Sequence, residues 1–215
     1  MARDDRPEII MTIVLLIRHG ENDYVKKGRL ACLLPGVHLN EAGRAQAQAL
    51  ADQLKDAPIK AIYSSPLERA VETAKPLAEV LGLEVIVRPG LMETNCGEWQ
   101  GKTVKSLSRL KSWKILQTNP SLFRFPGGES FQEIQFRFVQ EIQSLRAGHE
   151  EKDVFACVAH ADPIKLALAY YLGLPLDNFQ RFIIAPASVS ALLLGENGSH
   201  LLTMNYHPAF NLPKD

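Results

Sequence analysis

Hydrophobic residues occur in short continuous runs, separated by longer segments in which they recur every three or four positions. Ile13–Ile17 and Val154–Ala159 contain no charged residue, which is typical of strands buried on both faces of a sheet. Ala61–Tyr63 and Glu84–Val87 are shorter runs rich in β-branched and aromatic residues. These four runs predict four strands, and polar residues with possible chemical roles follow three of them directly.

The polar segment after the second strand run carries the signals of a helix start. Ser65 suits the N-cap, Pro66 suits the first helical position, and Glu68 completes a capping box. This helix should end at Gly82, and Pro76 should kink or break it. The same kinds of signal predict three more helices: Glu41–Leu54 after the cap Asn40, a helix through Phe131 and Leu145 after the capping box of Ser130 and Glu133, and a helix from the cap Asp162 and Pro163 that ends at Gly173.

The alternation of strands and helices predicts an α/β fold with a largely parallel central sheet. We expect a three-layer sandwich with helices on both faces. Ser188–Leu194 and Leu201–Asn205 flank a Gly-Glu-Asn-Gly turn, which predicts an antiparallel hairpin at the C-terminal edge. We expect a single domain over 1–215, in which 1–10 is a loose extension and the polar, irregular stretch 102–128 is an inserted lid or cap.

Composition and charge exclude several classes of protein. The 215 residues are 46% hydrophobic and 22% charged, which is typical of a globular chain. Lys plus Arg and Asp plus Glu both number 24, so there is no positive field to attract nucleic acid or an anionic membrane. The apolar run Ile9–Ile17 is too short to span a bilayer, and the N-terminal residues lack a signal-peptide pattern. We therefore expect a cytoplasmic protein without nucleic-acid or membrane partners, with Met11 as an alternative start.

The cysteines Cys32, Cys96 and Cys157 are too few and too scattered for a disulfide scaffold or a zinc site. Their odd number fits a reducing compartment. We expect Cys157, inside an apolar run, to be a buried apolar residue rather than a reactive thiol. The histidines and acids do not fall at zinc spacing either, so we expect no metal and no cofactor.

Candidate reactive residues lie where the predicted strands end. The first strand leads into Arg18–Glu21, the second into Ser65 and Arg69, and the fourth into His160. In open α/β sheets, the carboxyl ends of the strands form the ligand crevice. Each residue alone is ordinary, since a strand-end histidine is usually structural and a helical arginine usually forms a surface ion pair. Two arginines and two histidines together, with helix N-termini at Ser65 and Asp162, predict a pocket for a compact dianion, most simply a phosphate.

Four segments carry a more specific pattern. They are Leu16–Glu21 (LIRHGE), Tyr63–Ala74 (YSSPLERAVETA), Leu91–Gly101 (LMETNCGEWQG) and Val158–Ile164 (VAHADPI). In this order they resemble the motifs of the histidine phosphatase superfamily, also called the phosphoglycerate mutase-like family. The resemblance spans residue 13 to about residue 171, and the C-terminal hairpin is compatible with it.

The resemblance implies roles for five residues. His19 would be the nucleophile that takes the phosphoryl group as a phosphohistidine. Arg18, Arg69 and His160 would hold the phosphate oxygens and stabilise the transition state, which requires no metal. Glu93 would protonate the leaving alkoxide and later deprotonate the attacking water. Because an acid must hold its proton, we expect the pocket to raise the pKa of Glu93.

Further residues are assigned less directly. Ala161 and Arg29 are candidate substrate contacts, although Arg29 suits a solvated loop position equally well. The loop position of His38 places it near the site, where it would line the pocket. The remaining histidines match no catalytic position of the family and are expected to be structural or surface residues: His149, His200 and His207.

Departures from the mutase pattern favour a phosphatase. An asparagine of the mutases corresponds to Val25, their Thr/Ser-Gly pair to Ala31-Cys32, a tyrosine to Cys96, and a lysine to Val104. The groups that retain a bisphosphorylated intermediate are thus largely missing. The segment Pro126–Ser130 also resembles that of small-molecule phosphatases in the family. We predict an acid-type phosphomonoesterase that hydrolyses a small phosphorylated metabolite.

Two alternatives stay open. One is a cofactor-dependent phosphoglycerate mutase, and the other is a module that binds a phosphorylated ligand without turnover. The presence of both His19 and Glu93 favours an enzyme over a binding module, and hydrolysis of a generic aryl phosphate distinguishes the two. The sequence leaves sugar phosphates, phosphoglycerate-type acids, and nucleotide or cofactor-precursor phosphates as candidate substrates.

Overall fold

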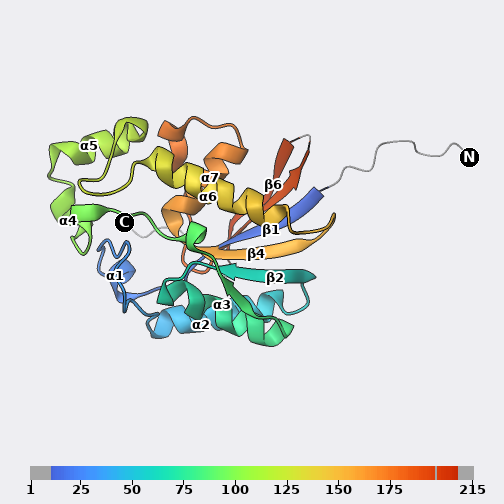
Figure 1. The fold of residues 1–215 in the computed structure, drawn as a ribbon. Helices are drawn as coiled ribbons and strands as arrows, with labels where there is room; N and C mark the ends of the chain where they lie inside the picture. The colour runs from blue at the N-terminus through green and yellow to red at the C-terminus, as the bar shows by residue number, and fades with distance from the viewer. Residues whose placement is uncertain (1–10, 197, 208–215) are drawn as a thin grey trace, which may run out of the picture.

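A six-stranded sheet lies between two layers of helices in the computed structural model, which describes residues 11–196 and 198–207 (Figure 1). The strand order is β3-β2-β4-β1-β5-β6. The strands are β1 (Met11–Arg18), β2 (Ile59–Ser64), β3 (Val85–Val87), β4 (Val154–Ala159), β5 (Val189–Gly195) and β6 (Gly198–Tyr206). The first four are parallel, whereas β5 pairs antiparallel with β1 and β6. The predicted three-layer α/β fold with an antiparallel C-terminal edge is confirmed.

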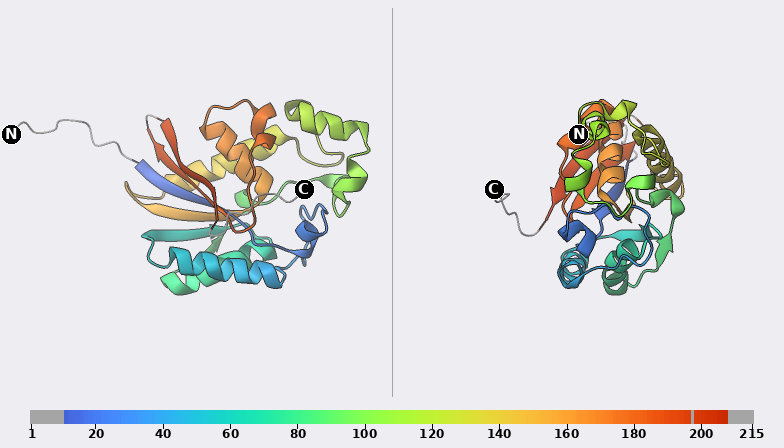
Figure 2. Two further views of the ribbon diagram at one scale, coloured as in Figure 1. Left: turned by 180° about the vertical axis from the view of Figure 1, so that it is seen from behind. Right: turned by 90° about the vertical axis from the view of Figure 1, so that its left-hand side faces the viewer.

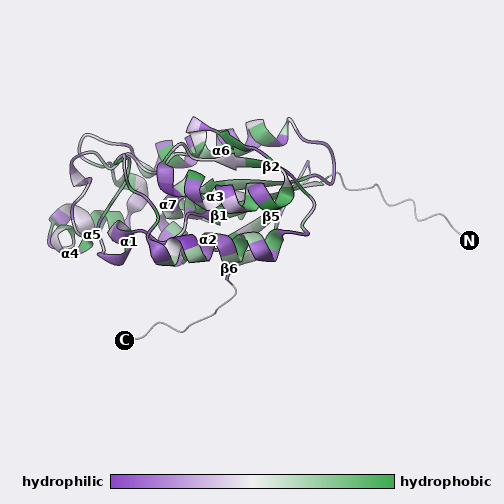
Figure 3. Cartoon of the chain, turned by 90° about the horizontal axis from the view of Figure 1, so that it is seen from below, coloured by the Kyte–Doolittle hydropathy of each residue, from purple (hydrophilic) through white to green (hydrophobic). Residues whose placement is uncertain are grey.

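Helices α2 and α3 cover one face of the sheet, and α6 and α7 cover the other (Figures 1 and 2). The α-helices are α1 (Asp23–Lys26), α2 (Glu41–Leu54), α3 (Glu68–Leu81), α4 (Val104–Leu107), α5 (Lys111–Thr118), α6 (Phe131–Arg146) and α7 (Ala161–Tyr171). Short 3-10 turns are η1 (Pro89–Leu91), η2 (Gly97–Trp99), η3 (Pro120–Leu122) and η4 (Leu176–Arg181). Hydrophobic residues run along the strands, and the covering helices carry hydrophobic and hydrophilic residues in alternation (Figure 3).

Both faces of β1 are buried, as its uninterrupted apolar run predicts. Val14 and Leu16 pack with the residues under α6 and α7, whereas Leu15 and Ile17 pack with those under α2 and α3. This follows from the two-residue period of a strand, which sends successive side chains to opposite faces. The burial holds the end of β1, and therefore the residues that follow it, in a fixed position.

The start of α3 differs from the prediction. The helix begins at Glu68 after the N-cap Leu67, which makes no side-chain capping bond. Ser65 lies two residues before the cap; its hydroxyl lies 2.8 Å from a ring nitrogen of His160 and accepts a 3.3 Å hydrogen bond from the Leu67 amide. The predicted break at Pro76 is wrong, since α3 continues through it to Leu81 and Gly82 follows as the C-cap with a φ of 66°, whereas a kink stays a prediction. Packing of this helix on the sheet offsets the one backbone hydrogen bond that a proline removes.

Two of the other predicted helix starts are confirmed, and the third is shifted by two residues. Asn40 caps α2 by accepting a 2.8 Å hydrogen bond from the Gly43 amide. Ser130 and Glu133 form the predicted capping box of α6. Helix α7 starts two residues earlier than expected, with His160 in place of Asp162 as its N-cap.

The stretch 102–128 is more regular than its polar composition suggests. It contains α4, α5 and η3, and it lies at the end of the sheet where β1 leads into α1 (Figures 1 and 2). Its apolar side chains join an aromatic cluster that includes Trp99 and Phe131. Among the described residues, no helix combines the length and apolar character needed to cross a membrane. The expected loose extension 1–10 lies outside the described residues.

Candidate active site

The sheet order brings the three predicted strand tips together. Strands β2, β4 and β1 are neighbours, and Arg18 at the end of β1 pairs in register with Ala159 at the end of β4. The next residues are therefore also neighbours: the rings of His19 and His160 lie 5.2 Å apart between centroids. The two histidines are far apart in sequence and adjacent in space because parallel strands end at one edge of a sheet.

A cavity of about 210 Å³ opens at this edge. Its lining includes Arg18, His19, Arg69 and Glu93, together with the predicted contacts Arg29 and Ala161. His160 lies directly behind it, with its Nδ1 3.7 Å from a carboxylate oxygen of Glu93. The structure thus gathers all the predicted site residues except His38.

The prediction that His38 lines the pocket is wrong. Its side chain is 59% exposed, and its Nδ1 lies 2.5 Å from a carboxylate oxygen of Glu72 on α3. That ion pair raises the pKa of His38 and directs the ring away from the strand ends. The loop was predicted to lie near the site. The ion pair with Glu72 sets the direction of the His38 ring.

His19 is held as a neutral base with one free nitrogen. The ring is 3% exposed, and its Nδ1–H donates a 2.7 Å hydrogen bond to the Gly20 carbonyl, which can only accept. Nε2 therefore carries the lone pair. Burial lowers the pKa of His19 well below its ordinary value, and the neighbouring Arg69 and Arg18 lower it further. An unprotonated Nε2 is the form that a nucleophile requires.

His160 presents the opposite ring nitrogen to the pocket. Its Nε2 lies 2.8 Å from Ser65 Oγ, and we assign the serine hydroxyl as the donor. The proton of the neutral ring is then on Nδ1, which has no hydrogen-bond partner among the described residues. Burial, followed by Arg69, lowers the pKa of His160. The Nδ1–H is available to an oxyanion in the cavity.

The two arginines each keep donors unused. Arg69 is 1% exposed; its Nη2 donates to the Cys32 carbonyl at 2.7 Å, while Nε and Nη1 have no partner. Arg18 Nη1 donates to the Ile184 carbonyl at 2.6 Å, and its Nε has no partner. Burial lowers the pKa of both groups, although guanidinium remains charged in proteins. Buried donors without acceptors are costly, so these groups favour an anionic ligand.

Glu93 has the environment expected of a general acid. Its side chain is 18% exposed, and one carboxylate oxygen accepts a 2.9 Å hydrogen bond from the Thr94 amide. Burial raises the pKa of Glu93, and the nearby Asp162 raises it further; Arg69 acts in the opposite direction. The direction agrees with the expectation from the sequence, with desolvation as the largest cause.

Two polar residues of the site, Asn22 and Thr94, and one contact were missed. Ser65 was expected at the pocket as a helix cap, but its hydroxyl contacts His160, 95 residues away. Asn22 is fully buried in the pocket lining; its Oδ1 caps α1 at 3.0 Å from the Val25 amide, and its Nδ2 has no partner. The Thr94 hydroxyl is also buried without a partner. The position of Asn22, three residues after His19, is the one local signal that pointed to this site.

The folded chain gathers a donor set that sequence spacing did not reveal. Potential metal-ligand atoms of His19, Glu93 and His160 lie within 4.8 Å of one another. The guanidinium groups of Arg18 and Arg69 line the same cavity, and their positive charge repels a metal cation there. The donor set therefore fits an anion better than a metal ion, and the absence of a metal stays a prediction.

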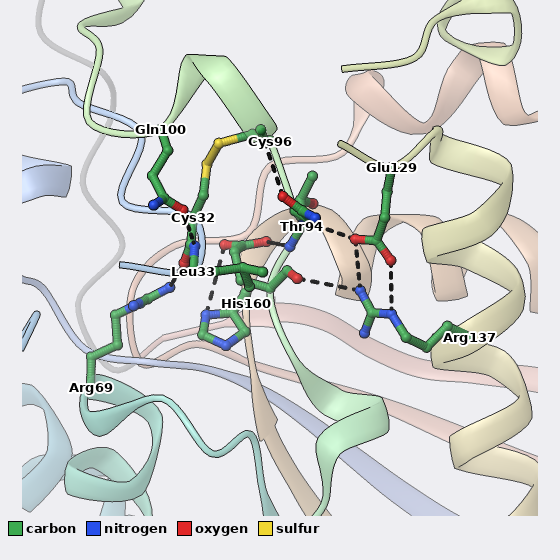
Figure 4. Close-up of a disulfide and its surroundings, with 12 residues drawn as sticks. Cys32, Leu33, Arg69, Thr94, Cys96, Gln100, Glu129, Arg137 and His160 are labelled. Atoms are coloured by element: carbon green, nitrogen blue, oxygen red, sulfur yellow. Dashed lines mark hydrogen bonds and ion pairs between the residues drawn. A yellow bond between two sulfur atoms is a disulfide. The ribbon is translucent and has the colours of Figure 1, made fainter. Parts of the chain in front are cut away.

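Two of the three cysteines, which are scattered in the sequence, are bonded to each other in the structure. Cys32 and Cys96 form a disulfide, and both line the cavity (Figure 4). The two lie 64 residues apart, and only the packing of the 93–96 segment against the loop after α1 brings them together. Cys157 is a free, fully buried cysteine, as its apolar run predicts.

Comparison with known proteins identifies matches over almost the whole described chain. The family model of the histidine phosphatase superfamily (branch 1) matches residues 14–207. Phosphoserine phosphatase 1 of Hydrogenobacter thermophilus is 31% identical over 197 residues, covering 91% of this chain and 92% of that protein. A 2,3-bisphosphoglycerate-dependent phosphoglycerate mutase of Thermoplasma acidophilum is 32% identical over 183 residues, covering 85% and 87%.

Solved structures show the same architecture. The mycobacterial glucosyl-3-phosphoglycerate phosphatase in complex with VO3 superposes with a TM-score of 0.83 at 30% identity, covering 91% of this chain and 99% of that one. The phosphoserine phosphatase of Entamoeba histolytica in complex with 3-phosphoglyceric acid gives a TM-score of 0.83 at 26% identity, covering 92% and 98%.

Proposed function

This chain belongs to branch 1 of the histidine phosphatase superfamily, and we propose that it is a phosphomonoesterase that acts on a small phosphorylated metabolite. The observation that carries the proposal is one cavity in which a neutral His19 faces buried, unpartnered donors of Arg18 and Arg69, with His160 beside His19 and its Nδ1 3.7 Å from a Glu93 oxygen. Such a set suits the three equatorial oxygens of a phosphoryl group in transfer.

In the proposed reaction His19 Nε2 attacks phosphorus and the ester oxygen leaves. Glu93 protonates that oxygen, so the product departs as an alcohol and the carboxyl becomes a carboxylate. The same carboxylate then takes a proton from water, which attacks the phosphohistidine and releases inorganic phosphate. Arg18 and Arg69 stabilise the charge in both transfers because their free donors are fixed before the reaction begins.

The walls of the cavity favour hydrolysis over the mutase reaction. A mutase must hold its bisphosphorylated intermediate while that intermediate reorients in the site. This requires polar contacts beyond the central phosphate site. Here the lining at the corresponding positions is Val25, Ala31 and the Cys32–Cys96 disulfide, none of which offers a charged side chain. Because one relative is a phosphoglycerate mutase, the mutase reaction is the second candidate function.

The cavity also suggests the class of substrate. Its size suits a phosphate with a short organic group, and Arg29 adds a cation at its exposed side. Phosphoserine and glucosyl-3-phosphoglycerate, named in two relatives, both carry a carboxylate close to the phosphate ester. We propose a phosphomonoester with a carboxylate that Arg29 contacts, and the backbone of Ala161 as a further contact.

We propose an acid-type enzyme, because Glu93 must be protonated while His19 must not. Burial raises the pKa of Glu93 and lowers that of His19, and both directions favour these two forms. The proposed compartment is the cytoplasm; the Cys32–Cys96 disulfide removes the argument for a reducing compartment that the odd number of cysteines had given. The stretch 102–128 supplies Phe125 to the cavity lining, which supports its proposed role as a lid.

The test is hydrolysis of an aryl phosphate and of a panel of metabolite phosphates, with free phosphate as the readout. Wild type quenched during turnover should carry acid-labile, base-stable phosphate, and His19→Ala should lose both this label and activity. His200→Ala, which changes an exposed histidine on β6, is the matched control and should keep both. Full activity in His19→Ala would contradict the proposed nucleophile. Isomerisation of 3-phosphoglycerate without phosphate release would favour the mutase.

A further inference from the structure

The Cys32–Cys96 disulfide forms part of the cavity wall. The Cα atoms of the two residues lie 6.0 Å apart, and the residues are 7% and 1% exposed. The bond joins the loop after α1 to the segment 93–96, which we call the acid segment because it begins with Glu93 (Figure 4). Both segments face the space that a substrate would fill.

The loop side of the bond supports Arg69. The Cys32 carbonyl accepts the 2.7 Å hydrogen bond from Arg69 Nη2, and this contact leaves Nε and Nη1 for the phosphate. Cys32 itself has a φ of 46°, a conformation that a residue with a side chain keeps only when its surroundings hold it. The next amide, that of Leu33, donates to Gln100 Oε1 at 3.1 Å. Any movement of Cys32 therefore moves the acceptor that orients the guanidinium.

The acid segment is held from its other side by α6. Arg137 donates to the Met92 carbonyl at 3.0 Å and to the Glu93 carbonyl at 3.3 Å. Glu129, which pairs with Arg137 at 3.1 Å, accepts a 2.8 Å hydrogen bond from the Asn95 amide. These contacts do not involve sulfur (Figure 4). When the disulfide is opened, the acid segment therefore keeps its hydrogen bonds with Arg137 and Glu129 and loses its covalent link to Cys32.

We propose that the Cys32–Cys96 disulfide positions Arg69 and Glu93 relative to each other, and that its reduction lowers turnover while the α6 contacts keep the site folded. The proposal rests on the phosphatase function proposed above. A dithiol reductant gives two electrons and two protons to the disulfide: the sulfur–sulfur bond breaks, Cys32 and Cys96 become thiols, and the reductant becomes a disulfide. The loop and the acid segment are then no longer covalently joined across the cavity.

The two positioned groups act differently, which makes the effect recognisable. Arg69 holds the phosphate whatever the leaving group, whereas Glu93 matters most when the leaving group is a poor one. A misplacement of about 1 Å can cost a reaction up to a factor of about 100. We expect reduction to lower kcat/KM for an alkyl phosphate about tenfold. The loss for an aryl phosphate should be smaller, so the ratio of the two rates changes.

The experiment compares oxidised enzyme with enzyme treated with dithiothreitol, using p-nitrophenyl phosphate and 3-phosphoglycerate. Alkylation followed by mass spectrometry counts the thiols released, and reoxidation with diamide should restore the alkyl-to-aryl ratio. Cys157→Ala removes the buried cysteine outside the site and should respond to the reductant as wild type does. The folded double variant Cys32→Ser/Cys96→Ser should show the alkyl-to-aryl rate ratio of reduced enzyme. Treatment with dithiothreitol should not change that ratio.

The inference is overturned if fully reduced wild type keeps the oxidised rate ratio. If the native bond resists reduction, the double variant decides, and a folded variant with the oxidised ratio overturns the inference. If the double variant does not fold, the reductant titration of wild type decides. An oxidised wild type without activity on any phosphate ester would contradict the proposed function itself, which is a different result from an active enzyme that is indifferent to reduction.

Discussion

Replacing Glu93 by glutamine removes a proton donor and changes little else. Glutamine has nearly the same shape, and its amide oxygen can accept the 2.9 Å hydrogen bond that the Thr94 amide gives to Glu93. What disappears is a carboxyl group whose pKa is raised by burial and by Asp162, the direction that favours a proton donor. General acids of this kind contribute a factor of about 10²–10⁴. We expect kcat for an alkyl phosphate to fall by that factor.

Aryl phosphates should behave differently in Glu93→Gln. An aryl oxide leaves with little help from a proton, so transfer to His19 should stay fast. Hydrolysis of the phosphohistidine then lacks its base, and the intermediate should accumulate. Rapid mixing with p-nitrophenyl phosphate should show a burst close to one product per site, followed by slow turnover. Glu98→Gln, at an exposed glutamate of the same region, is the matched control and should show neither effect.

The pH dependence of kcat/KM also tests Glu93 as the proton donor. Only the protonated carboxyl of Glu93 donates, so wild-type kcat/KM for an alkyl phosphate should fall as pH rises through the raised pKa of Glu93. On the acidic side His19 stays neutral, because burial and the two arginines lower its pKa. The ionisation of the substrate itself acts on both proteins equally. The difference between the profiles of wild type and Glu93→Gln therefore isolates Glu93.

Two results would refute this reasoning. One is a glutamine variant that hydrolyses alkyl phosphates at the wild-type rate. The other is an equal loss for alkyl and aryl substrates without a burst, which would place Glu93 in phosphate binding rather than proton transfer.

Four further predictions test other parts of the site and its support. Ser65→Ala removes the donor to His160 Nε2, and kcat should fall roughly tenfold, the equivalent of about one hydrogen bond; Tm should fall by a few degrees, because the buried His160 Nε2 and the Leu67 amide lose their partner. Phosphatase activity should survive exhaustive EDTA treatment; loss of activity that zinc or magnesium restores would contradict the anion-binding interpretation of the donor set. Gly43→Ala places a Cβ 2.0 Å from the Glu21 carbonyl oxygen, so the loop after the nucleophile must move, and both activity and Tm should drop. Phe131→Ala, at a fully buried ring in the aromatic cluster, should lower the free energy of unfolding by about 3–5 kcal/mol in urea titrations, and a loss below 1 kcal/mol would contradict that packing.

The elements that the sequence predicted well are those specified by neighbouring residues. The buried strands follow from uninterrupted apolar runs, and the caps of α2 and α6 follow from Asn40 and Ser130, whose partners lie three residues away. Pro76 failed as a helix breaker because packing against the sheet, which no local signal reports, keeps α3 continuous. The meeting of His19, His160 and Arg69 could be predicted because parallel strands end at one edge.

Contacts between distant parts of the chain could not be predicted in the same way. Nothing beside Ser65 indicates that its hydroxyl serves a histidine 95 residues later rather than its own helix. The pairing of Cys32 with Cys96 depends on how the acid segment packs across the cavity, and each cysteine alone looks like a small apolar residue. His38 shows the reverse case, since its loop lies near the site but Glu72 directs its ring elsewhere.

The unpartnered buried donors of the arginines and His160 also matter between turnovers. Inorganic phosphate carries the same kind of oxygens that these donors would bind in the ester, so it can occupy the same site. The released product should therefore bind again and compete with the next ester, and its binding should raise the melting temperature. We expect the rate in a cell to follow the ratio of ester to free phosphate, so that phosphate starvation accelerates the enzyme without any change in the amount of protein.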